Sequence, residues 1–112
     1  MTYTLLLLYP NEAHTTFDMT YYLEKHMPKV ERIWRKHGLR SWHVTKYNST
    51  LDGPKPTYLL GTTIEWGSED DMKATLKDPE VAELFEDFEN FGNTPPISVA
   101  RSALQIELLD SN

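Results

Sequence analysis

Apolar and polar residues follow two different periods along this chain, and segments with these periods follow one another in a regular order. Runs rich in Leu, Tyr, Val, Ile and Trp read as β-strands. Other segments repeat an apolar residue every three or four positions, which places these residues on one face of a helix. The predicted elements, in chain order, are strand 2–9, helix 19–37, strand 41–47, strand 57–66, helical region 68–91 and strand 97–108.

Residues that begin or end helices stand at the breaks between these segments. Asp18 and Ser68 each precede a helical pattern and can cap its first turn. Gly38 follows the first helix and ends it. Asp78 and Pro79 interrupt the second helical region and restart it as an N-cap and a first-turn proline. These signals support the element order β-α-β-β-α-β.

This order predicts the α+β class, with a ferredoxin-like four-stranded antiparallel sheet and both helices on one face. Strand 2–9 is apolar on both faces at its centre, as expected of an inner strand. Strand 97–108 changes the phase of its alternation, which a bulge at 101–103 would reconcile. The other sheet face would expose Tyr, Leu and Trp side chains. We therefore expect a homodimer that packs sheet against sheet.

Composition and length narrow the class of protein. A chain of 112 residues corresponds to a single domain, 1–112. It has no cysteine, which excludes a disulfide scaffold, a thiolate metal site and a cysteine nucleophile. The apolar run 5–9 ends at Pro10, is too short to cross a bilayer and follows no basic segment. We predict a cytoplasmic protein without a membrane span or signal peptide.

The formal net charge is −6, which argues against a nucleic-acid partner. The charge is uneven, because residues 1–47 carry +3 and residues 48–112 carry −9. The first helix has a basic stripe, and the second helical region has nine acidic residues. We expect these charges to meet where the two helices lie side by side, and we interpret the stripe as a solvated face. The stripe consists of Lys25, Lys29, Arg32, Arg35 and Lys36.

The histidines do not form a metal-binding motif. His26 and His37 share a helix face, but three turns separate them by about 16 Å, so they cannot bind one ion. A metal held by His26, His43 and a distant carboxylate stays open as a minor alternative, and the prediction is no metal. No nucleophile elbow, phosphate-binding loop or dinucleotide fingerprint occurs either. Serine hydrolysis and nucleotide cofactors are therefore disfavoured.

A proline inside the first helix marks the most informative position. Pro28 removes a backbone hydrogen bond and crowds the carbonyl of Glu24. His26 lies two residues earlier, on the apolar flank beside Tyr22. One interpretation is a kink in which His26 bonds a freed helix carbonyl. The other is a gap between helix and sheet, into which His26 points as an acid or base.

These residues carry a resemblance to a known family. The run Tyr21-Tyr22-x-x-x-His26-x-Pro28, followed by Gly38-Leu39, resembles the first half of EthD-family proteins. The stretch Asp87-Phe88-x-Asn90-Phe91 is similar to the acidic, aromatic end of the family's second helix. The resemblance implies a dimeric α/β barrel with a ligand cavity between sheet and helices in each subunit. It also implies cofactor-independent chemistry on ethers, aromatic compounds or polyketides.

The resemblance maps the family's histidine and tyrosine onto His26 and Tyr22, as the expected catalytic pair. It also maps an asparagine–phenylalanine pair onto Asn90 and Phe91. We expect His26 to transfer a proton and Tyr22 to orient it or bind the substrate oxygen. The predicted function is an oxidoreductase, isomerase or dehydratase acting on a small hydrophobic carbonyl or phenolic compound. The alternative is a ligand-binding or accessory module without catalysis. The expected substrate-binding residues are Trp34, His43, Phe88, Asn90 and Phe91.

Overall fold

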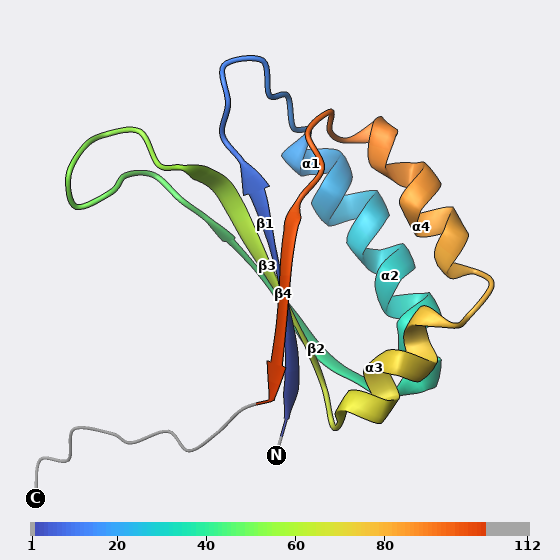
Figure 1. Ribbon diagram of the computed structural model, residues 1–112. Coiled ribbons are helices and arrows are strands. Elements are labelled where there is room, and N and C mark those ends of the chain that lie inside the picture. The colour runs from blue at the N-terminus through green and yellow to red at the C-terminus, as the bar shows by residue number, and fades with distance from the viewer. Residues whose placement is uncertain (1, 103–112) are drawn as a thin grey trace, which may run out of the picture.

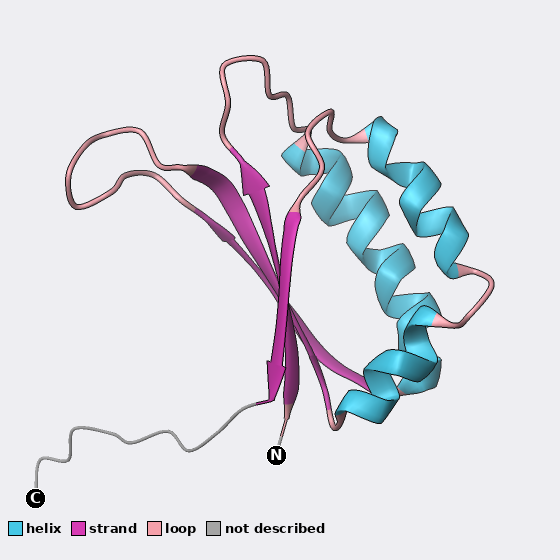
Figure 2. Ribbon diagram, viewed as in Figure 1, coloured by secondary structure: helices cyan, strands magenta, loops and turns pink. Residues whose placement is uncertain are grey.

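The computed structural model describes residues 2–102 and shows a four-stranded antiparallel sheet with helices on one face (Figures 1 and 2). The strand order is β2-β3-β1-β4, so β1 and β3 are the inner strands, as the apolar pattern of 2–9 predicted. This arrangement confirms the predicted α+β, ferredoxin-like fold. The strands are β1 Tyr3–Pro10, β2 Leu39–Lys46, β3 Tyr58–Trp66 and β4 Ile97–Ser102.

Both predicted helical regions are present, and both are divided into shorter pieces. The first consists of α1 Met19–Tyr21, a π-helical turn Tyr22–His26, α2 Met27–Trp34 and a 3-10 turn Arg35–His37. The second consists of α3 Glu69–Leu76, α4 Val81–Asp87 and a 3-10 turn Phe88–Asn90. In Figure 1, α4 runs beside α2, which it contacts.

Three of the predicted helix boundaries are confirmed, and the restart of the second helical region at Asp78 and Pro79 is not. The side chains of Asp18 and Ser68 accept hydrogen bonds from the N–H groups of Tyr21 and Asp71, at 3.0 and 3.2 Å. Gly38 has φ +87°, a left-handed conformation that other residues rarely adopt, and it ends the first helical region. The second region restarts slightly later than predicted, at Val81, after Asp78 accepts a hydrogen bond from the N–H of Glu80.

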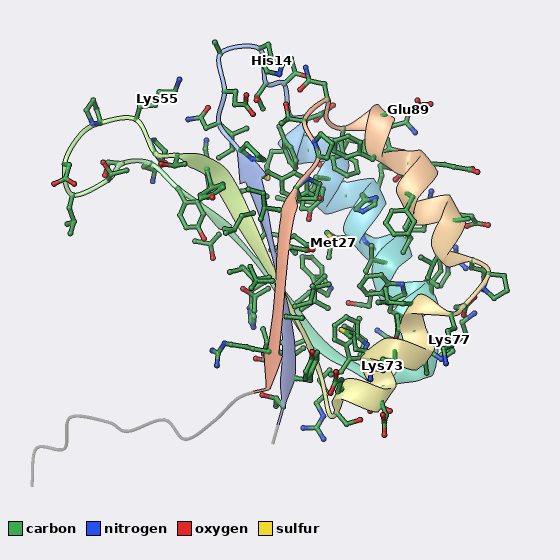
Figure 3. The ribbon with its side chains drawn as sticks, viewed as in Figure 1. His14, Met27, Lys55, Lys73, Lys77 and Glu89 are labelled. Carbon is green, nitrogen blue, oxygen red and sulfur yellow. The ribbon has the colours of Figure 1, made fainter. Side chains whose placement is uncertain are left out.

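The main core lies between the sheet and the helices. Alternate residues of β3 face the helices, and Leu60, Ile64 and Trp66 among them are at most 1% exposed. Met27, labelled in Figure 3, points from α2 toward the sheet and is equally buried. The helices meet through opposite charges, as predicted: the guanidinium of Arg32 lies 3.6 and 3.9 Å from the carboxylates of Glu80 and Glu83.

The opposite sheet face carries no helix in the described part of the chain (Figure 2). Leu6 pairs with Val99 and Leu8 with Ile97 across β1 and β4, and all four side chains lie on this face. Ile97 and Val99 are 49% and 54% exposed. The expectation of tryptophans on this face is wrong, because Trp42 and Trp66 occupy helix-facing positions. The pairing of β4 with β1 is regular up to Ser102, and the rest of the predicted bulge lies outside the described residues.

Candidate functional site

The proline of the first helical region coincides with a local change of helix type. Residues Tyr22–His26 form a π-helical turn, and the N–H of Met27 donates to the carbonyl of Tyr22, five residues earlier. A wider turn relieves the crowding that Pro28 would cause in a regular α-helix. It also brings the rings of Tyr22 and His26 into a stack, with centroids 5.4 Å apart and planes 16° apart. Both side chains are buried.

His26 pairs with a carboxylate from the neighbouring helix. Its Nδ1 lies 2.9 Å from Oδ2 of Asp87, which is the last residue of α4. The two side chains are 9% and 4% exposed, so this is a buried pair. The kink interpretation, in which His26 bonds a freed helix carbonyl, is therefore wrong about the partner: Nδ1 binds a side chain of another element.

Asp87 is held by several donors at once. Its Oδ1 accepts from the hydroxyl of Tyr21 at 2.6 Å and from Nδ2 of Asn90 at 2.9 Å, and Nζ of Lys29 lies 3.7 Å away. Burial alone would raise the pKa of Asp87. The hydrogen bonds from Tyr21, Asn90 and His26 and the nearby Lys29 outweigh burial and lower this pKa to about 2. Asp87 is therefore ionised at neutral pH.

The ionised carboxylate determines the tautomer of His26. A carboxylate only accepts hydrogen bonds, so Nδ1 of His26 carries the proton and donates it to Asp87. Burial lowers the pKa of His26 and outweighs the opposing effect of Asp87, so the imidazole is neutral at pH 7. Its Nε2 then has a free lone pair, and no hydrogen bond within residues 2–102 engages it. This nitrogen can accept a proton.

The ring of Tyr22, which stacks on this imidazole, carries a buried hydroxyl. Its oxygen lies 2.6 Å from Oγ1 of Thr62, a residue of β3 with no exposed surface. Burial raises the pKa of Tyr22, and the hydrogen bond with Thr62 opposes this only in part. The phenol therefore keeps its proton and, when Thr62 donates to it, can donate a hydrogen bond of its own.

A cavity of about 500 Å³ lies between the sheet and the helices, and both His26 and Tyr22 line it. Its other walls are mostly apolar, and its aromatic residues include Trp34, Phe88 and Phe91. Phe85 also borders the cavity, and its side chain is 72% exposed. The buried stripe of the second helical region runs through positions 81, 84, 87 and 91, and Phe85 lies beside it. A neutral hydrophobic molecule is the kind of ligand that suits these walls.

The structure brings most of the predicted site residues together around the cavity, but Asn90 and His43 do not line it. Asn90 does not line the cavity and acts instead on Asp87. His43 lies elsewhere: it pairs with Thr63 on the sheet face that points away from the helices, and its side chain is exposed. A metal shared by His26 and His43 is therefore excluded by position. Within residues 2–102, no group of three or more His, Asp or Glu side chains is arranged to hold a metal ion.

Sequence reasoning included Asp87 and Tyr21 in the motifs of the resemblance but assigned neither a role in the site. Asp87 is one of nine acidic residues in its region, and the others lie on exposed or half-buried positions. One signal was available, because Asp87 stands three residues after Leu84 and four before Phe91, on the buried stripe. An acidic residue on such a stripe needs a partner.

Comparison with known proteins identifies the fold. No family model matches the sequence, and none of the curated proteins does. An EthD-like protein from Ralstonia eutropha JMP134 matches with a TM-score of 0.82 and 22% identity, over 98% of this chain and 97% of that one. An EthD family protein from Bacillus halodurans C-125 matches with a TM-score of 0.72 and 18% identity, over 93% of this chain and 100% of that one. SnoaB, a cofactor-independent oxygenase from Streptomyces nogalater, matches with a TM-score of 0.63 and 8% identity, over 94% of this chain and 93% of that one.

At these identities the matches establish the fold. Within the described residues, no helix is long and apolar enough to cross a membrane. The chain has the fold of EthD-like proteins along almost its whole length, in agreement with the resemblance read from its motifs.

Proposed function

We propose that this protein is a small, cofactor-independent, EthD-like enzyme that performs acid–base chemistry on a hydrophobic carbonyl or phenolic compound. The observation that carries the proposal is the buried pair of His26 and Asp87 on the wall of an apolar cavity. A neutral imidazole whose Nδ1–H is held by a carboxylate is the arrangement that directs the basicity of Nε2 toward a ligand.

The reaction would begin with a proton transfer inside the cavity. Nε2 of His26 takes a proton from the carbon next to a carbonyl, or from a phenol, and Asp87 stabilises the resulting imidazolium. The hydroxyl of Tyr22 donates to the oxygen on which negative charge develops. Return of the proton to another carbon gives isomerisation, and its transfer to a leaving hydroxyl gives dehydration. An oxygenase reaction would in addition take dioxygen as the oxidant.

Deuterium exchange tests the proton transfer without knowledge of the natural substrate. β-Tetralone is a neutral two-ring ketone with acidic hydrogens beside its carbonyl, and its size suits the cavity. We expect the protein to accelerate the exchange of these hydrogens in D₂O, followed by NMR, and His26→Gln to slow this exchange by about 10²–10⁴-fold. His14→Gln, in an exposed loop, is the matched control and should keep the rate.

The same variants separate the enzyme from a binding module. A carrier needs the cavity but not the imidazole. Binding of β-tetralone without accelerated exchange, with equal affinity for His26→Gln, would support the carrier and contradict the enzyme. Thermal unfolding of each variant shows whether it is folded, so that a loss of exchange reports on chemistry rather than on stability.

We also propose that a second copy covers the open sheet face. An apolar strip lies there, formed by Leu6, Leu8, Ile97 and Val99. Isolated domains of this size seldom leave such a strip exposed to solvent. His43 lies on the same face and would be close to the partner. A dimer should bury more than about 1,600 Å² in total. Sedimentation at micromolar concentration is expected to give twice the chain mass of 13.0 kDa; particles of one chain only would contradict the dimer.

A further inference from the structure

Two tryptophans pack against each other in the core, and only one of their indole N–H groups has a partner. Trp34 and Trp66 have ring centroids 5.4 Å apart and planes tilted by 35°. Nε1 of Trp66 donates to Oγ1 of Thr75 at 2.9 Å. Nε1 of Trp34 has essentially no contact with solvent and no acceptor, and it is the only such buried side-chain polar atom within residues 2–101.

An unpaired buried donor is unfavourable, and folded proteins contain few of them. Trp34 borders the cavity that contains His26, whereas Trp66 does not. Trp66 packs against one part of the indole of Trp34, so a ligand acceptor would approach the indole from the cavity. Nε1 has essentially no contact with solvent in the free protein, so this hydrogen bond would require a rotation of the indole toward the cavity.

We infer that Nε1 of Trp34 binds an acceptor oxygen of the ligand, at the end of the cavity opposite His26. This inference rests on the proposed function, because it concerns a ligand of the same cavity. His26 and Trp34 are eight residues apart along the helix, which corresponds to about 12 Å. The ligand is therefore an elongated, neutral molecule of about two rings. It has its reacting carbonyl or phenol at one end and a second oxygen acceptor at the other.

A pair of matched biphenyls tests this assignment. Both have a phenol at one para position; one has an acetyl group at the far para position, and the other has an isopropenyl group of the same shape without the oxygen. Calorimetric titration gives the dissociation constant of each. We expect the wild-type protein to bind the acetyl compound about five- to tenfold more tightly, as for one hydrogen bond to a buried donor. The indole N–H resonance of Trp34 should move in NMR spectra with this compound alone.

Trp34→Phe removes the N–H and keeps an aromatic ring, and it is expected to abolish the difference between the two ligands. Because each protein is compared across two ligands of equal shape, effects of the substitution on packing cancel in the ratio. Trp66→Phe is the control: it removes the paired N–H outside the cavity, and the preference for the acetyl compound should persist.

The outcomes distinguish this inference from the proposed function. Equal binding of both biphenyls by the wild-type protein, or a preference that survives in Trp34→Phe, would overturn the role of Trp34 and leave the cavity and His26 unaffected. Failure of both biphenyls and of β-tetralone to bind would overturn the ligand cavity itself, and the inference with it.

Discussion

Replacing Asp87 by asparagine tests the central pair of the site, because it changes charge and donor pattern while keeping shape. Two donors, the hydroxyl of Tyr21 and the amide of Asn90, converge on Oδ1 of Asp87, and Nδ1 of His26 faces Oδ2. The new amide keeps both donors only with its oxygen in the Oδ1 position. Its NH₂ group then faces His26, so Nδ1 must accept and the proton moves to Nε2. The base loses its lone pair toward the cavity.

The size of the stability effect follows from the pKa of Asp87, which is about 2 in the folded protein against an ordinary 3.8. A difference of nearly two units corresponds to about 2 kcal/mol, since each unit is worth about 1.4 kcal/mol. A lowered pKa stabilises the folded state fully above pH 3.8, and this contribution is lost as the pH falls toward 2. Asp87→Asn should therefore be less stable by about 2 kcal/mol at pH 7, and the difference should shrink between pH 4 and 2.

Two measurements check this prediction. Urea unfolding at equal protein concentration gives the stability difference at each pH. Nitrogen NMR of the His26 ring distinguishes its protonated from its unprotonated nitrogen, and we expect the two to exchange identity in Asp87→Asn. Deuterium exchange of β-tetralone should fall together with the tautomer change. The reasoning is refuted if Nδ1 stays protonated in the variant, or if the stability difference is the same at pH 2 and pH 7.

Three further predictions concern other parts of the molecule. Val99→Glu should yield monomers in sedimentation, whereas Leu51→Glu in an exposed loop should not; dimers of Val99→Glu would place the interface elsewhere. Tyr22→Phe removes the partner of the Thr62 hydroxyl and should lower the free energy of unfolding in urea by about 1–3 kcal/mol, and the additional change Thr62→Val should recover most of this loss. No recovery in the double variant would contradict the role of this bond. The free energy of unfolding of the wild-type protein should fall as the pH drops below 6.5, because burial lowers the pKa of His26 in the folded state and the unfolded chain therefore binds the proton at a higher pH. His26→Gln should not show this fall in urea unfolding; if the variant has the same pH dependence as the wild type, another group causes it.

The fold was predictable because the sequence of each helix and strand carries its own local signals. Period-two alternation in 57–66 fixes which side of β3 faces the core, and the caps at Asp18, Ser68 and Gly38 set the helix ends. The position of the inner strands followed from the apolar centre of 2–9. Phe85 also fits the apolar spacing of the second helical region, and only the packing of α4 against α2 decides that its side chain stays exposed.

The candidate site was predictable only where it lies within one segment. Tyr22, His26 and Pro28 belong to a single helical region, and their spacing was visible. Asp87 is 61 residues away from His26, and only the approach of α4 to α2 makes them neighbours. His43 was included because it follows closely in the chain, but the sheet separates it from the cavity.

Pro28 links the local sequence to the geometry of the site. In a regular α-helix its ring would meet the carbonyl of Glu24, and its missing N–H would leave that carbonyl unpaired. The π-helical turn relieves this conflict, and in the same turn both Tyr22 and His26 face the core rather than solvent. A π turn is itself less favourable than an α turn, so it persists only with compensation from its surroundings. The stacked rings, the Tyr22–Thr62 bond and the His26–Asp87 pair supply it, which is why the helix distortion and the candidate site depend on each other.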